Sequence, residues 1–167
     1  CHYKSGNMIV QGDPLPRIND LSELPSPYLS GLMDKFFDDV LIPMISTTRG
    51  CPFKCTFCSE GHSHYNMVSK RYDLSEELLY IANRIGKMTD LCLTDANWGM
   101  FKEDMDKAII LADIQDKFNW PRELIVSSGK NQKERVMKVA SLLKGAMFAG
   151  GAMQTTDQEI LKNIKRS

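Results

Sequence analysis

Short apolar runs alternate with segments of helical periodicity from residue 40 onward, and this alternation is the feature that most constrains the fold. The apolar runs are candidate β-strands and fall at residues 40–45, 91–93, 124–126 and 146–149. Apolar side chains at three- and four-residue spacing predict amphipathic helices within residues 74–85, 105–112, 136–143 and 160–164. A strand followed by a helix, four times in succession, indicates an α/β fold with a parallel sheet and right-handed crossovers.

Prolines are concentrated before this alternation, where four of the seven in the chain stand between residues 14 and 27. Proline holds its own backbone and the residue before it in extended or turn conformations. A short helix is expected at residues 28–37, because apolar side chains recur there at helical spacing. We therefore expect residues 1–38 to form a linker or the tail of a preceding domain. Residues 39–167 are expected to form a core domain that is incomplete at its C-terminus, so that the chain is a fragment.

The charge balance of the chain excludes one broad class of function. Lysine plus arginine is 21 and aspartate plus glutamate is 21, so the formal net charge is zero. A neutral chain has no basic excess with which to release counterions from nucleic acid, and we expect no nucleic-acid partner. No apolar run approaches the roughly 20 residues that span a bilayer, and no membrane association is expected. The sequence carries no secretory n-region, which predicts a cytoplasmic location.

Three of the five cysteines, Cys51, Cys55 and Cys58, lie close together after the first expected strand. A clustered trio in a chain with five cysteines does not fit a disulfide framework and indicates a metal site. Three thiolates on one loop can hold three irons of an iron–sulfur cube, which leaves the fourth iron free for a ligand outside the protein. The alternative is a structural zinc module in which His62 or His64 supplies the fourth ligand.

The stretch RGCPFKCTFC at residues 49–58 resembles the hallmark loop of the radical S-adenosylmethionine (radical SAM) enzymes. It fits the form found in members that carry a preceding cobalamin-binding domain. The stretch at residues 20–29 is similar to the segment that joins the two domains in that subgroup, and residues 94–99 and 153–157 match family motifs after later strands. The resemblance implies a partial TIM-type barrel of parallel βα units, of which about four of the expected six fall in this chain.

The resemblance also implies a set of cofactors. Cys51, Cys55 and Cys58 would ligate a [4Fe–4S] cluster, and its fourth iron would bind the amino and carboxylate groups of S-adenosylmethionine. An electron from a donor such as flavodoxin or ferredoxin would then cleave S-adenosylmethionine, and the resulting 5′-deoxyadenosyl radical would abstract hydrogen from a small-molecule substrate. Cobalamin is implied for the full-length protein, which makes a cobalamin-dependent methyltransferase one expected reaction class. The family position before the third cysteine, here Phe57, packs beside the adenine.

Further contacts to S-adenosylmethionine are expected from the ends of the later strands. Many family members place Gly-Gly-Glu after the second strand, where this chain has Asp95-Ala96-Asn97. We expect either backbone carbonyls of this stretch or the side chains of Asp95 and Asn97 to serve the methionyl amine. Ser127 and Ser128 at the end of the third strand, and Gln154 after the fourth, are expected to meet the carboxylate or the ribose.

Overall fold

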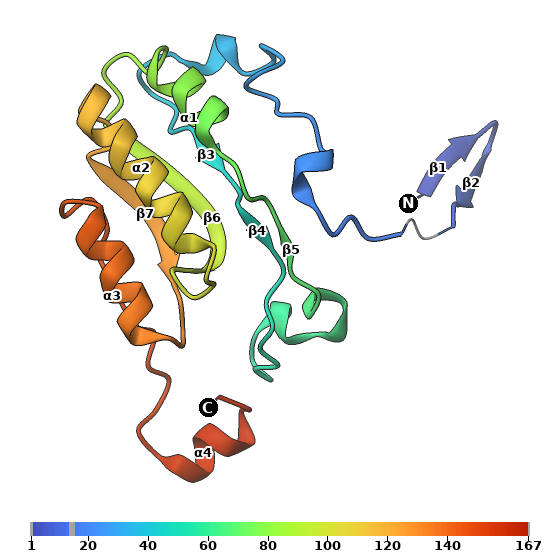
Figure 1. The fold of residues 1–167 in the computed structure, drawn as a ribbon. Helices are drawn as coiled ribbons and strands as arrows, with labels where there is room; N and C mark the ends of the chain where they lie inside the picture. The colour runs from blue at the N-terminus through green and yellow to red at the C-terminus, as the bar shows by residue number, and fades with distance from the viewer. Residues whose placement is uncertain (1, 14–15, 167) are drawn as a thin grey trace.

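A parallel sheet of three strands forms the centre of the computed structural model, which describes residues 2–13 and 16–166. The strands run in the order β3 (Met44–Ile45), β6 (Asp90–Trp98) and β7 (Glu123–Ser128), so that the longest strand is central (Figure 1). Only the last two residues of the first expected strand are paired. Pro43 lacks an N–H and precedes β3, and its carbonyl accepts from the backbone N–H of Cys92 at 3.0 Å. The predicted α/β class with parallel strands is confirmed.

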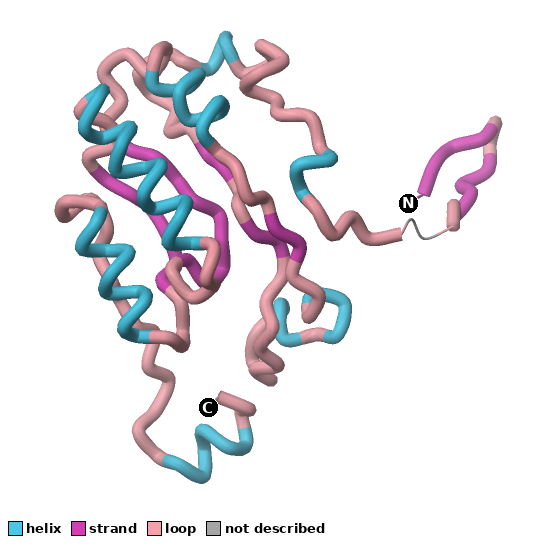
Figure 2. Tube along the Cα trace, in the orientation of Figure 1, coloured by secondary structure: helices cyan, strands magenta, loops and turns pink. Residues whose placement is uncertain are grey.

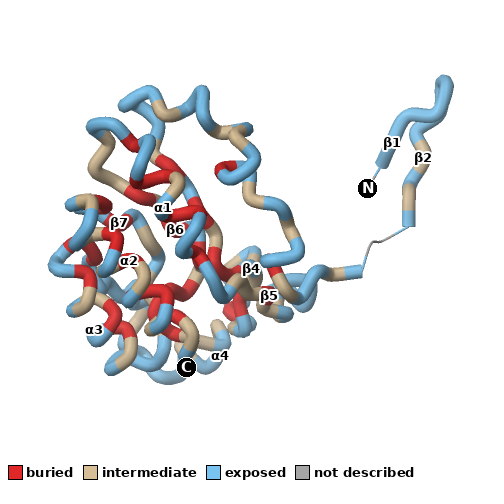
Figure 3. The backbone as a smooth tube through the Cα atoms, turned by 45° about the horizontal axis from the view of Figure 1, so that its top comes forward, coloured by how far each residue is buried: buried red, intermediate tan, exposed pale blue. Residues whose placement is uncertain are grey.

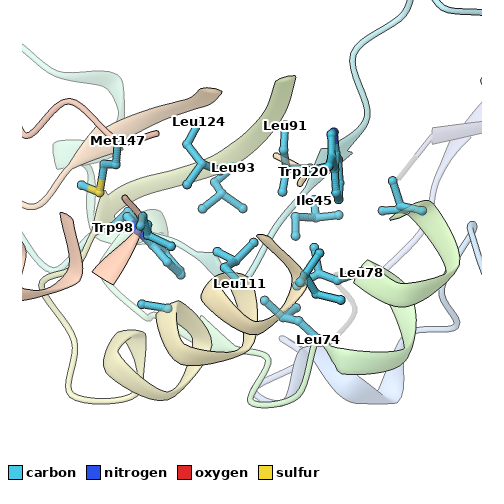
Figure 4. Packing of buried hydrophobic residues seen from close by; sticks show 14 of the residues in the cluster. Ile45, Leu74, Leu78, Leu91, Leu93, Trp98, Leu111, Trp120, Leu124 and Met147 are labelled. Carbon is cyan, nitrogen blue, oxygen red and sulfur yellow. The ribbon is translucent and has the colours of Figure 1, made fainter. Parts of the chain in front are cut away.

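Three helices lie along one face of this sheet, namely α1 (Ser75–Ala82), α2 (Asp104–Phe118) and α3 (Lys133–Leu142) (Figures 1 and 2). Each overlaps a segment in which helical periodicity predicted a helix, although on α2 the apolar Ile109 is 47% exposed and the charged Lys107 is buried. Leu91, Leu93 and Leu124 point from the strands into the layer between sheet and helices, where Leu78 and Leu111 meet them (Figure 4). This layer is the hydrophobic core.

Successive residues of β6 point to opposite faces of the sheet, as strand geometry requires. Leu91 and Leu93 are buried against the helices, whereas Cys92 is half-buried and Thr94 is exposed on the other face. On β7, Leu124 is buried and Ile125 is exposed in the same alternation. One face of the sheet therefore carries the core, and the other is open.

The segment before β3 is extended and turning rather than helical. β1 (His2–Ser5) and β2 (Met8–Gln11) form an exposed antiparallel hairpin that stands away from the sheet (Figures 1 and 3). The 3₁₀ turn η1 (Leu21–Glu23) follows it. Cys1 lies outside the described residues. The division at residue 38 into a linker and a core domain stays a prediction.

The prediction of a helix at residues 28–37 is wrong. The segment forms turns and one 3₁₀ turn, η2 (Asp34–Phe36), because Gly31 has a φ of 75° that an α-helix does not allow. Tyr28 is nevertheless buried, and its hydroxyl donates to the Met44 carbonyl at 3.1 Å and accepts from the Met44 N–H at 2.9 Å. Tyr28 therefore joins this segment to the edge strand, and Met33 and Phe37 also pack against the core.

The prediction of a fourth strand at residues 146–149 is also wrong. The Ala146 carbonyl accepts from the Leu124 N–H at 2.8 Å, but no ladder follows and Phe148 is 81% exposed. Glycines at 145, 150 and 151 flank this run, and glycine weakens a strand because it has no side chain to pack. The chain continues as a loop to α4 (Gln158–Asn163), whose first turn is capped by the Asp157 carboxylate. Among the described residues the sheet thus has three parallel strands and is not closed.

No helix in the described parts of the chain combines the length and the apolar character that crossing a bilayer requires.

Candidate metal loop and ligand cavity

The three clustered cysteines lie on a loop that is closed at its base by a short antiparallel ribbon. β4 (Thr48–Arg49) leads into the loop and pairs with β5 (Ser69–Lys70), which leads out of it. Two 3₁₀ turns, η3 (Ser59–Gly61) and η4 (Ser63–Tyr65), lie between them, and the Cys51 N–H donates to the Tyr65 carbonyl at 2.8 Å. We call residues 50–68 the cysteine loop. It follows the carboxyl end of β3, the edge at which parallel α/β folds place their sites.

The cysteine loop supplies the right donor atoms for an iron–sulfur cluster. All three thiols are free, Cys51 and Cys55 are buried, and Cys58 is half-buried. Cys55, Cys58 and His62 line a hollow of about 310 Å³. Within residues 2–13 and 16–166, however, no three histidine, cysteine or acidic side chains are gathered closely enough to hold a metal ion. Soft thiolate donors suit iron–sulfur clusters and zinc alike, so the chemistry of the donor set fits either group.

Of the two histidines named in the zinc alternative, His62 lines the hollow beside Cys55 and Cys58, whereas His64 does not. His62 and His64 are both exposed, and the ring of His64 packs edge-on against Tyr65 with centroids 5.1 Å apart. Cys92 lies outside the loop, on the open face of β6. Burial raises the pKa of the Cys92 thiol, which favours the protonated form and disfavours a role as thiolate ligand.

Gly61 is the tightest point of the cysteine loop. A Cβ atom at this position would lie 2.1 Å from the carbonyl oxygen of Cys55, which is backbone and cannot rotate away. We expect Gly61→Ala to cost about 1–3 kcal/mol of stability through this overlap. The cost should be confined to the loop, so the variant should show faster proteolysis between residues 50 and 68 with little change at the helices. Equal protease sensitivity of variant and wild type would contradict this account of the loop.

The C-terminal segment packs against the cysteine loop. The Thr56 N–H donates to the Ile164 carbonyl at 3.1 Å, just after α4. The guanidinium of Arg166 reaches Cys55, with Nη1 4.0 Å from Sγ, and its Nη2 donates to the Ala152 carbonyl at 2.9 Å. Sequence reasoning did not select Arg166, because a cation after a helix end usually lies in solvent. It contributes positive charge beside a candidate ligand thiol.

Asp95 is buried within β6 rather than placed after it. Its carboxylate accepts from the backbone N–H groups of Thr47 and Thr48 at 2.7 and 3.2 Å, and also from the Thr47 hydroxyl. Thr47 lies between β3 and β4, and Thr48 is the first residue of β4, which leads into the cysteine loop. Asp95 thus fastens the start of the loop to the central strand, and its predicted contact with the methionyl amine stays untested.

A buried ion pair supports the same segment from α2. Lys107 is fully buried, and its ammonium donates to Thr47 Oγ1 at 2.9 Å and lies 3.4 Å from Asp104 Oδ1. Burial raises the pKa of Asp104, while the neighbouring Lys107 acts in the opposite direction and Asp95 adds to the increase. The Phe101 N–H also donates to Asp104, at 2.9 Å. One buried polar network therefore joins the central strand β6, the helix α2 and the segment that leads into the cysteine loop.

Asn97 contacts a candidate ligand directly. Its side chain is buried near the end of β6 and its Nδ2 donates to Cys51 Sγ at 3.3 Å. Lys130, in the loop after β7, donates to Asn97 Oδ1 at 3.0 Å. Sequence reasoning placed Asn97 after the strand and gave it a role toward S-adenosylmethionine. The observed contact is with a cysteine, and the proposed cofactor contact remains a prediction.

An open cavity of about 1390 Å³ lies over the uncovered face of the sheet. Of the predicted site residues, the structure places Asp95, Ser127, Ser128 and Gln154 in its lining, whereas Asn97 and Phe57 are not part of it. Phe57 is 53% exposed on the cysteine loop. Glu60 of that loop and Arg166 also line the cavity, which therefore reaches from the sheet to the cysteine loop. Its volume exceeds the range usual for small-molecule sites.

Fold and site together define a class, namely α/β proteins with a three-cysteine loop at the carboxyl end of the first sheet strand and a ligand cavity beside it. The chain is 31% identical to the cobalamin-dependent radical SAM methyltransferase TokK of Streptomyces tokunonensis. It is 32% identical to the 2-(S-pantetheinyl)-carbapenam-3-carboxylate methyltransferase of Streptantibioticus cattleyicolor. Both alignments cover 98% of the chain. The chain belongs to the radical SAM enzymes.

The extent of the similarity differs between relatives. The chain spans 25% of the length of each of these two methyltransferases. It is also 41% identical over 61 residues to an uncharacterized methyltransferase of Pyrococcus horikoshii, a match that covers 35% of the chain and 13% of the relative. No family model matches the chain. Family membership therefore rests on the two relatives aligned along nearly the whole chain.

Proposed function

We propose that this chain is the part of a radical SAM enzyme that holds the [4Fe–4S] cluster and the first part of the S-adenosylmethionine site. The observation that carries the proposal is the position of the cysteine loop, whose residue Glu60 borders the large cavity on the open face of the sheet. Cys51, Cys55 and Cys58 would hold three irons, as their number and spacing suit a cluster with one open iron. When bound, the cluster supplies the electron that cleaves the sulfonium of S-adenosylmethionine.

The lining of the cavity supports binding of a polar cofactor. Ser127, Ser128 and Gln154 line the cavity, and hydroxyl and amide side chains suit a carboxylate and a ribose. The Ser128 hydroxyl already contacts the Phe148 carbonyl and the Gly150 N–H, at 3.4 and 3.3 Å. Arg166 supplies positive charge at the end nearest the cysteine loop. Phe57 lies on the cysteine loop and does not line the cavity, so it would contact the adenine only if S-adenosylmethionine extended along that loop. Apolar residues such as Ile125 and Val126 line the remainder, which favours exclusion of water from the reaction.

The wider architecture and the reaction class belong to the same proposal. Three parallel strands with helices on one face are compatible with the start of a partial TIM-type barrel, whose remaining strands would close over the open face. The two relatives are named as methyltransferases, one of them cobalamin-dependent. We therefore infer methyl transfer to a small molecule, with cobalamin and an electron donor such as flavodoxin or ferredoxin as partners of the whole protein.

Product analysis tests this function. The full chain is reconstituted anaerobically with iron and sulfide and then mixed with S-adenosylmethionine and dithionite. We expect 5′-deoxyadenosine and methionine to appear with wild type and to fall to background with Cys51→Ala. A protein that carries its full iron content, yet forms neither product, would contradict the proposal.

A further inference from the structure

The side chain of Asn97 joins a cation to a candidate cluster ligand. Asn97 is 1% exposed, and its two polar atoms have one partner each, with Nδ2 at 3.3 Å from Cys51 Sγ and Oδ1 at 3.0 Å from Lys130 Nζ. Neither contact is local in sequence, since Asn97 lies 46 positions from Cys51 and 33 from Lys130. A buried amide between an ammonium and a thiol is an arrangement that acts on the charge of the sulfur.

Lys130 fixes the orientation of this amide. An ammonium is a donor only, so the atom of Asn97 that faces Lys130 must be the oxygen. The other atom, which faces Cys51, must then be the nitrogen with its two N–H groups. The reverse orientation would place N–H groups against the ammonium and an oxygen lone pair against the sulfur, and both contacts would be repulsive. The donor character of Asn97 toward Cys51 therefore follows from Lys130.

Lys130 is itself held in place by the turn after β7. The Gly129 N–H donates to the Trp98 carbonyl at 2.8 Å, and a Cβ on Gly129 would lie 2.8 Å from the Cβ of Met100. This close approach brings the turn down onto the end of β6. The ammonium of Lys130 also lies 3.4 Å from the Ala96 carbonyl and 5.7 Å from the ring centroid of Phe53, on the cysteine loop. These contacts keep the cation over Asn97.

We propose that Asn97, oriented by Lys130, is a positioning residue whose N–H···S hydrogen bond to Cys51 raises the reduction potential of the cluster. This inference rests on the proposed function. Reduction adds negative charge to the cluster and its thiolate ligands. A donor hydrogen bond to a ligand sulfur stabilises that charge, and the effect is strong in a buried site where water does not compete. A cation behind the donor polarises the amide and increases the effect.

We call the hydrogen-bonded series Lys130–Asn97–Cys51 the relay. Redox titration followed by electron paramagnetic resonance (EPR) tests its effect on the reduction potential without measuring turnover. The full chain is loaded with its cluster, and wild type is compared with Asn97→Leu, which keeps the volume and removes the donor. Lys130→Met removes the cation from a partly exposed position and serves as the second variant if Asn97→Leu fails to fold. Lys133→Met is the matched control, because it removes an equal charge from an exposed lysine on α3 that does not bond to Asn97 among the described residues.

We expect both Asn97→Leu and Lys130→Met to be harder to reduce. At a fixed solution potential their reduced fraction relative to oxidised should fall by about tenfold, which corresponds to about 59 mV for a one-electron couple. Lys130→Arg should restore most of the shift, and Lys133→Met should leave the midpoint unchanged. Equal midpoints for wild type, Asn97→Leu and Lys130→Met would overturn the relay alone. Failure of wild type to form any cluster would overturn the proposed function, and the relay with it.

Discussion

Replacing Lys107 by methionine is expected to destabilise the protein by about 3–5 kcal/mol, the largest stability loss that the structure predicts for a single substitution. Lys107 is fully buried, and its ammonium lies 3.4 Å from the carboxylate of Asp104, which is buried as well. The substitution would leave that carboxylate without its counter-charge and would also remove the donor to Thr47 Oγ1. Urea unfolding of the full chain, monitored by circular dichroism, measures the loss.

An exposed ion pair provides the matched control for this experiment. Lys144 pairs with Asp116, but their side chains are 54% and 65% exposed. Water and salt screen such a pair, so Lys144→Met should change stability by less than about 1 kcal/mol. Similar losses for Lys144→Met and Lys107→Met would show that burial does not set the strength of the Lys107–Asp104 pair.

The sign of the pH dependence follows from Asp104. Burial raises the pKa of this carboxyl above its ordinary value, and removing Lys107 would raise it further. A group whose pKa is higher in the folded state contributes stability at low pH and loses that contribution as pH rises through the folded pKa. The destabilisation by Lys107→Met should therefore be smaller in mild acid than at neutral pH. A loss that grows as the pH falls would contradict the assignment.

Substitution of any one of the three loop cysteines by alanine is expected to remove the cluster. With two thiolates left, the cube would lose one of its three protein ligands, and iron content should fall from about four per chain toward zero. Cleavage of S-adenosylmethionine should fall with it. Iron analysis after anaerobic reconstitution and desalting measures the first effect, and product analysis measures the second.

Cys92→Ala is the control for these variants. Cys92 is half-buried on the open face of β6, and burial raises the pKa of its thiol. The Cys92→Ala variant should retain its full iron content, because the three loop cysteines supply the cluster ligands without Cys92. If Cys92→Ala lost iron while Cys55→Ala retained it, the cysteine loop would not be the site of the cluster.

The periodicity of apolar residues in the sequence correctly predicted those helices and strands whose side chains pack into the hydrophobic core. Leu78 on α1 and Val139 on α3 are fully buried, as their helical spacing predicts, whereas on α2 the buried apolar residue is Leu111 and Ile109 is 47% exposed. The same reasoning failed at residues 146–149, where the apolar run has no partner strand on its far side and Phe148 is exposed. An apolar run shows that burial is favourable, but it does not show which surface provides it. Gly31 likewise stops a helix that spacing alone predicted.

The donor set of the site was evident from the sequence, whereas its supporting contacts were not. Cys51, Cys55 and Cys58 are neighbours in the chain, so their spacing alone indicates a shared ligand. The contact between Asn97 and Cys51 depends on the register of β6 beside the loop, which no local pattern encodes. Asp95 was expected to face a cofactor, yet its carboxylate holds the backbone of Thr47. Strand length explains the difference, because β6 continues to Trp98 and includes both residues.

The EPR spectrum of the reduced cluster, recorded with and without S-adenosylmethionine, tests the central claim most directly. Three cysteine ligands leave one iron open, so binding of S-adenosylmethionine to that iron should change the spectrum of wild type. Cys51→Ala should give no cluster signal under either condition. A colourless protein that binds one zinc and shows no iron-dependent signal would contradict the account, and so would a reduced cluster whose spectrum does not respond to S-adenosylmethionine.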